Sequence, residues 1–216
     1  MTNLRPKAPP ALSEPVATVR LPQGARVWRV HHRDWEANAL NSTPQPHRES
    51  GGRFDSISDP VDYSYTYVAR PINGSIAETI GRELPDTSKP QLVPKWRVKD
   101  RLLSQMLVSE DIFVATLHGP TLNAIGAGAW LTTCDPYEYV ITREWARAII
   151  NAPNQPTGIE YRGRLDTDEV SYVLTGIPGA NDHRSLQPIG TAIPLDSHEG
   201  MELVNEVLAP HGAQLA

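Results

Sequence analysis

The sequence has few cysteines and no long apolar run, the features that mark disulfide-rich, zinc-binding and membrane proteins. Its single cysteine, Cys134, excludes an intramolecular disulfide and any zinc site built from several cysteines. We therefore expect Cys134 to be a small buried residue and the protein to reside in a reducing compartment. No apolar run approaches the roughly 20 residues of a membrane helix, and the N-terminus shows no apolar core of signal-peptide length. These absences predict a cytosolic protein without a membrane partner.

Positive charge is also scarce. The 216 residues include 20 Lys and Arg against 25 Asp and Glu, which gives a net charge of 20 − 25 = −5. Such a balance does not favour direct binding of nucleic acid. Hydrophobic residues make up 39% and charged residues 21%, a balance typical of a globular chain. We expect one domain of this length to bury most of its unfolded surface.

The common catalytic motifs are missing as well. The chain has no G-x-x-x-x-G-K-[ST] phosphate loop, no H-E-x-x-H zinc helix and no G-x-S-x-G nucleophile elbow. The stretch "GAGAW" at 126–130 lacks the third glycine of a dinucleotide fingerprint. His31 and His32 are neighbours on a predicted strand and point to opposite faces, so they do not present two ligands to one metal. No metal site is expected.

The patterns that are present predict a mixture of strands and helices. The mixture shows no regular alternation, which favours a single α+β domain over a doubly wound parallel sheet. Five prolines before residue 24 predict an extended or partly disordered arm over 1–24, followed by a main domain over 25–195 and a C-terminal helix in 196–216 packed on the same domain. Strands are expected at 26–32, 63–69, 111–117, 158–165, 169–176 and 191–195, and helices at 74–84, 97–107, 142–152 and 200–210.

The strand predicted at 26–32 alternates in character. Trp28 and Val30 share one face, which we expect to be core, and Arg29 and His31 share the other, which carries cations. The polar, turn-rich residues 41–60 follow, and a loop of this length is usually functional or disordered.

Glu78 can be interpreted in two ways. Ile76, Ile80 and Leu84 form one helical stripe, and Glu78 lies about 160° from its middle, so it faces away from the main core. In the first interpretation Ser75 and Glu78 form a helix capping box, with Arg82 as a further partner one turn on. In the second, Glu78 belongs to a catalytic cleft.

An ordered set of motifs favours the cleft. "VWRVHH", "GGRFDS", "YTYVARPINGSIAETI", "YEYVITREWARAI" and "GIEYRGR" follow one another over roughly residues 25–195, and together they resemble the RES domain, a family of bacterial NAD-consuming enzymes. The resemblance implies a compact fold similar to ADP-ribosyltransferases, with a mixed sheet and flanking helices. It also implies NAD as substrate, phosphate as a co-substrate, no metal, and an antitoxin partner with a helix-turn-helix part that restrains the enzyme as a toxin.

The resemblance also assigns residues. The catalytic positions of the family fall on Arg29, Tyr67 and Glu78, and a second arginine that binds the substrate falls on Arg53. A carboxylate at Glu78 would stabilise the positive charge that develops on ribose as nicotinamide leaves. The arginines would neutralise phosphate groups, and Tyr67 would stack on nicotinamide. The literal Arg-Glu-Ser at 48–50 is a coincidence within the loop.

The family serine does not carry over. The family runs approximately Tyr-x-Ser-Arg where this chain has Tyr161-Arg162-Gly163-Arg164. Either the Gly163 backbone N–H still binds an anion together with Arg162 and Arg164, or the site is altered enough to change the reaction. The sequence thus predicts an NAD phosphorylase or NAD glycohydrolase that acts as a toxin. An ADP-ribosyltransferase that modifies a protein and an inactive binding module are the rivals, and the oligomeric state stays open.

Overall fold

The fold is built on one eight-stranded mixed sheet. The computed structural model describes residues 8–47, 51–85, 87 and 89–216. The strand order is β1-β6-β7-β8-β3-β2-β5-β9, and every neighbouring pair is antiparallel except β6 and β7. The strands are β1 (Thr18–Leu21), β2 (Arg26–His32), β3 (Ser64–Ala69), β5 (Arg101–Val108), β6 (Ile112–Leu117), β7 (Gly158–Arg162), β8 (Val170–Gly176) and β9 (Leu186–Pro194). A separate parallel pair joins β4 (Gln91–Val93) to β10 (Ala213–Leu215).

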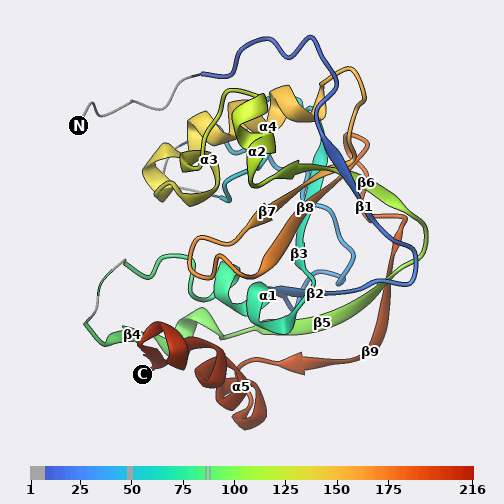
Figure 1. Cartoon of the computed structure of the whole chain (residues 1–216). Coiled ribbons are helices and arrows are strands. Elements are labelled where there is room, and N and C mark those ends of the chain that lie inside the picture. The colour runs from blue at the N-terminus through green and yellow to red at the C-terminus, as the bar shows by residue number, and fades with distance from the viewer. Residues whose placement is uncertain (1–7, 48–50, 86, 88) are drawn as a thin grey trace.

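Helices cover the sheet in two separate groups. In Figure 1, α2, α3 and α4 gather at one end of the molecule, and α1 and α5 lie at the other. The helices are α1 (Ile72–Thr79), α2 (Pro120–Ala124), α3 (Trp130–Thr133), α4 (Tyr139–Ile150) and α5 (His198–Leu208), with short 3₁₀ turns η1 (Lys95–Arg97), η2 (Pro136–Glu138) and η3 (Ala209–His211). Each helical group packs on its own apolar core, so the two groups are separated by a boundary on the same side of the sheet.

The first of these cores lies under α2, α3 and α4, where Leu131, Trp145 and Ile149 pack on Ile159 and Val173 of the sheet. The second lies under α1 and α5 and joins residues of both helices to β2 and β5. Its fully buried members include Ile76, Leu103, Val204 and Leu208.

A third core fills the other face of the sheet and contains no helix residue. Val27, Val68, Met106, Val114 and Leu174 meet there, and each is at most 3% exposed. Since no helix covers these side chains, the sheet buries them by curling around them. Both faces of a central strand such as β2 are therefore covered, and His31, on the face that the sequence predicted to carry cations, is buried.

The structure confirms a single α+β domain, and most predicted elements recur. The strand predicted at 26–32 coincides with β2. The helix predicted at 97–107 is wrong, because residues 101–108 form strand β5 between β2 and β9. Leu103 and Met106 point to opposite, equally buried faces, and their spacing of three residues imitates a helical period.

The capping box is also wrong. Helix α1 begins at Ile72, with Pro71 at its N-cap and no side-chain cap. Ser75 thus lies one turn inside the helix, where it is buried, and Glu78 lies in its last turn. The predicted start at 74 is two residues late, and the helix begins directly after Pro71.

Replacing Ser75 with alanine should therefore leave the melting midpoint unchanged or slightly raised. The hydroxyl caps nothing, and alanine has the higher helix propensity, by roughly 0.5 kcal/mol. Thermal unfolding followed by circular dichroism measures the change. A fall in the unfolding free energy of about 1 kcal/mol, the usual value for a lost N-cap, would contradict this.

The two ends of the described chain are both attached to the domain. Residues 18–21 of the proline-rich arm form β1, which pairs with β6 at the sheet edge. At the other end, α5 packs on α1, and the Leu215 N–H donates to Oδ1 of Asn205 over 2.8 Å. Within the described residues no helix is long and apolar enough to cross a membrane.

Candidate active-site pocket

A pocket of about 290 Å³ opens where the two helical groups meet. Strands β2 and β3 pair at one position only, Trp28 with Ala69, whereas β3 and β8 pair at six. The two strands therefore separate, and side chains from both reach the gap between them. The pocket brings together Arg29, Arg53, Tyr67 and Glu78 from four separate segments.

Glu78 is held between a backbone amide and a buried guanidinium. Its Oε1 accepts a hydrogen bond from the Arg164 N–H over 2.9 Å, and its Oε2 lies 3.9 Å from Nη1 of Arg53. The side chain is 16% exposed. The partner suggested one turn on, Arg82, contacts Glu83 instead. Glu78 therefore serves the pocket, and not the end of its own helix.

Arg53 is enclosed by aromatic rings. Its guanidinium carbon lies 5.9, 5.4 and 5.7 Å from the ring centres of Phe54, Tyr139 and Tyr161. Burial opposes the charge, but the neighbouring Tyr139, Glu78 and Tyr161 outweigh it and raise the pKa of Arg53 above its ordinary value. Arg53 is thus a permanent positive charge fixed beside Glu78.

Tyr67 is fixed by Asp55, a residue that the sequence did not single out. The Tyr67 hydroxyl donates to Oδ1 of Asp55 over 2.7 Å and accepts from the Phe54 N–H over 2.9 Å. Oδ2 of Asp55 accepts from the Gly52 N–H over 2.6 Å. Burial and the Asp55 charge raise the pKa of Tyr67 well above its usual range, so the phenol stays protonated. Asp55 lies in the motif "GGRFDS", two residues after Arg53, and this position was the signal in the sequence that could have identified it.

Hydrogen bonds from α4 hold the loop that carries Gly52, Arg53 and Asp55. Arg143, which is fully buried, donates from Nε to the Gly52 carbonyl over 2.9 Å and from Nη1 to the carbonyls of Gln45 and His47 over 2.6 and 2.7 Å. Thr142 donates to the Arg53 carbonyl over 2.6 Å. The pair lies within "YEYVITREWARAI", where the sequence predicted a helix and one of the family motifs but no role for either residue.

Arg29 both lines the pocket and fastens a loop. Its Nη1 donates to the carbonyls of Ala37 and Ala39 over 2.8 and 2.6 Å. Burial lowers the pKa of Arg29 to about 10, so the side chain is still charged at neutral pH. Part of its hydrogen-bonding capacity is therefore used for structure.

The segment 162–164, for which the sequence predicted an anion site, lies outside the pocket lining. Arg162 donates to the Asp168 carbonyl, and the Gly163 N–H donates to the Glu169 carbonyl over 3.3 Å. The Arg164 side chain donates to the carbonyls of Arg82 and Leu84, and none of the three residues lines the pocket. Their contribution is indirect, through the Arg164 N–H that binds Glu78.

Gly163 has a steric reason to be glycine. A Cβ atom at this position would lie 2.9 Å from Oε1 of Glu78 and 2.9 Å from the Asp166 carbonyl oxygen. Real Cβ atoms do not approach other heavy atoms that closely. The departure from the family pattern therefore leaves the space that Glu78 occupies.

Two buried polar atoms in the pocket walls have no hydrogen-bond partner among the described residues. Nε of Arg53 and Oγ1 of Thr66 are buried without a hydrogen bond within the described part of the chain. Unpaired buried groups of this kind commonly mark a ligand site.

Cys134 is buried as expected, and burial raises the pKa of its thiol to about 11, which keeps it protonated and unreactive.

A larger hollow of about 1040 Å³ lies elsewhere. Asp62, Phe113, Asn154, Ile177 and Arg184 are among the residues that line it. It contains none of the predicted site residues. Its ion pair, Arg184 with Glu110 at 3.3 Å, is 90% and 53% exposed, whereas Arg53 and Glu78 are 4% and 16% exposed. No group of three or more potential metal ligands occurs among the residues that the structure describes. The smaller pocket is therefore the candidate active site.

Comparison with known proteins agrees with this architecture. The sequence pattern of the RES domain matches residues 26–196, which is more than half of the chain. A chain in the crystal structure of the M. tuberculosis MbcT–MbcA toxin–antitoxin complex has a similar fold, with a TM-score of 0.57, 15% sequence identity, and coverage of 88% of this chain and 92% of that one. No curated protein sequence matches.

Proposed function

This chain belongs to the RES domain family, and we propose that its pocket binds NAD and breaks the bond between nicotinamide and ribose. The observation that supports this most directly is the Glu78 carboxylate in a pocket lined by five arginines, Arg29, Arg53, Arg82, Arg97 and Arg101. The other carboxylate in the lining, Asp55, is engaged by Tyr67 and the Gly52 N–H. Glu78 among several positive charges suits a substrate whose reacting sugar becomes cationic while its phosphates are anionic.

The chemistry follows from the charges. As the C–N bond breaks, its electron pair leaves with nicotinamide as a neutral base, and positive charge develops on the ribose carbon. Glu78 stabilises that charge from a position fixed by the Arg164 N–H and Arg53. A phosphate oxygen or a water oxygen then forms the new bond to the same carbon. Phosphate yields ADP-ribose 1″-phosphate, whereas water yields ADP-ribose and a proton.

The tyrosines that line the pocket are the residues that would bind nicotinamide. Tyr67, Tyr139 and Tyr161 line the pocket around Arg53 and Glu78. Flat rings favour a flat aromatic ligand by stacking. A volume of about 290 Å³ is at the small end for ligand pockets, roughly 300–1,000 Å³. Such a volume suits the nicotinamide riboside half of NAD, with the adenosine half outside.

We further propose that the enzyme acts as a toxin under the control of a partner protein. The similar chain comes from a toxin–antitoxin complex, which supports this role. Expression of the chain alone in a bacterial host should then arrest growth, and Glu78→Gln should relieve the arrest. Normal growth with abundant wild-type protein in the soluble fraction would count against the toxin role.

The activity itself is tested with purified protein and NAD, with and without inorganic phosphate. Mass spectrometry of the products separates the outcomes. ADP-ribose 1″-phosphate establishes phosphorolysis, and ADP-ribose alone establishes hydrolysis. Label found only on an added protein establishes ADP-ribosyl transfer to protein, and no consumption of NAD under any condition leaves a binding module.

A further inference from the structure

Three arginines form a second charged group in the pocket wall, apart from Arg53 and Glu78. Arg82 follows α1, Arg97 ends η1 and Arg101 begins β5, and all three line the pocket. Their side chains are more accessible than that of Arg53. Arg82 is 35% and Arg97 16% exposed, against 4% for Arg53. The three arginines therefore line the outer part of the pocket.

The charge of this group is poorly balanced. Glu83 contacts both Arg97, at 3.2 Å, and Arg82, at 3.7 Å, but Glu83 itself is 54% exposed. The Arg101 side chain has no hydrogen bond or ion pair within the described ranges of the chain. Burial and the positive charges of Arg97 and Arg82 lower its pKa, and no acid opposes them. Three like charges in one pocket wall that share a single, half-exposed counter-ion destabilise a fold, and a bound anion reduces that cost.

We propose that Arg82, Arg97 and Arg101 form a phosphate-binding subsite at the outer part of the pocket. The proposal rests on the proposed function, since it places a phosphate group next to the sugar that Glu78 serves. Guanidinium groups bind phosphate oxygens in pairs, which three converging arginines allow and lysines do not. The phosphate comes either from the dinucleotide or from a free phosphate that attacks ribose.

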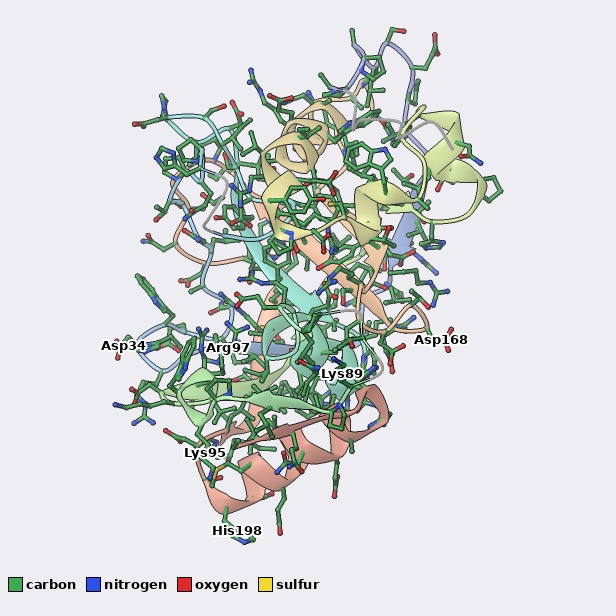
Figure 2. The ribbon with its side chains drawn as sticks, turned by 90° about the vertical axis from the view of Figure 1, so that its left-hand side faces the viewer. Asp34, Lys89, Lys95, Arg97, Asp168 and His198 are labelled. Carbon is green, nitrogen blue, oxygen red and sulfur yellow. The ribbon has the colours of Figure 1, made fainter. Side chains whose placement is uncertain are left out.

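The neighbourhood offers a matched control. Lys95 is exposed, precedes Arg97 by two residues in η1, and does not line the pocket. Figure 2 shows Arg97 at mid-height, between the group of α2, α3 and α4 above and α5 below, whereas Lys95 lies lower, toward α5. Lys95→Gln removes the same charge as Arg101→Gln from the same part of the surface, but outside the subsite.

The experiment compares these variants in the full chain. Isothermal titration with inorganic pyrophosphate and with inorganic phosphate measures binding without turnover. Arg101→Gln and Arg97→Gln should each weaken binding about tenfold or more, the value of one charge-assisted hydrogen bond, and Lys95→Gln by less than about twofold. Arg101→Gln should keep or raise the melting midpoint, because it relieves repulsion. A structural role for Arg101 would instead lower the midpoint.

Steady-state kinetics then identify the source of the phosphate. A higher KM for NAD with an unchanged KM for phosphate assigns the subsite to the dinucleotide, and the reverse assigns it to free phosphate. If NAD is consumed and Arg101→Gln matches Lys95→Gln in binding and in both KM values, the subsite is refuted and the proposed function stands. If pyrophosphate binding depends on Arg101 but NAD is not consumed, the subsite stands and the proposed function fails.

Discussion

Glu78→Gln is expected to lower NAD turnover at least about a hundredfold, the usual scale for a lost electrostatic catalyst. The amide keeps the shape of the side chain, and its oxygen can still accept from the Arg164 N–H at the position that Oε1 holds. It cannot offer the negative charge that the developing cation on ribose requires. Mass-resolved measurement of nicotinamide release, at a temperature well below the melting midpoint, gives the rate per folded molecule.

The same substitution should also lower stability. Arg53 is 4% exposed, and Glu78 is the acid that forms its ion pair. Removing one partner of a buried pair leaves an uncompensated charge, which typically costs about 3–5 kcal/mol. The surrounding tyrosine rings reduce that cost for Arg53. Denaturant unfolding measures the loss.

Glu206→Gln is the matched control, because Glu206 is an exposed acid on α5 and does not line the pocket. It should change neither turnover nor stability appreciably. Full activity of Glu78→Gln, measured beside this control, would remove Glu78 from the mechanism and leave it as the counter-charge of Arg53.

The sequence predicted the principal pocket residues because each belongs to a local motif. Arg29 lies in a strand, Arg53 follows two glycines, and Glu78 lies on the polar side of a helix. Such local patterns fix secondary structure and faces, and their order along the chain matched one family. The separation of β2 and β3, which makes the pocket, depends on pairing between distant segments, and no single segment specifies it.

Residues that act through distant contacts were missed for the same reason. Asp55 reaches Tyr67 across twelve positions, and Arg143 reaches Gly52 across ninety-one. Arg101 fell inside a predicted helix, so its place in the pocket wall could not be foreseen. The error at β5 thus hid a charged part of the site as well as a strand.

Gly163 tests how closely the pocket depends on the position of Glu78. The resemblance to the family places a serine here, so a simple expectation is that Gly163→Ser restores a lost hydroxyl. The structure predicts the opposite. The added Cβ would lie 2.9 Å from Oε1 of Glu78 and 2.9 Å from the Asp166 carbonyl oxygen, and the latter is backbone and cannot simply rotate away. The Glu78 carboxylate must move to relieve the first contact, and the backbone around residue 163 or 166 must shift to relieve the second.

A shift of about 1 Å in a catalytic group can cost about a hundredfold in rate, and we expect Gly163→Ser to lose turnover on that scale. Gly163→Ala is the matched variant, because it adds the same Cβ without the hydroxyl. Both should lose activity to a similar degree, since the collision involves the atom that they share. Nicotinamide release below the melting midpoint separates this effect from unfolding. A serine variant faster than the wild type, with alanine slow, would show that the hydroxyl itself serves the reaction and that Glu78 has room to accommodate it.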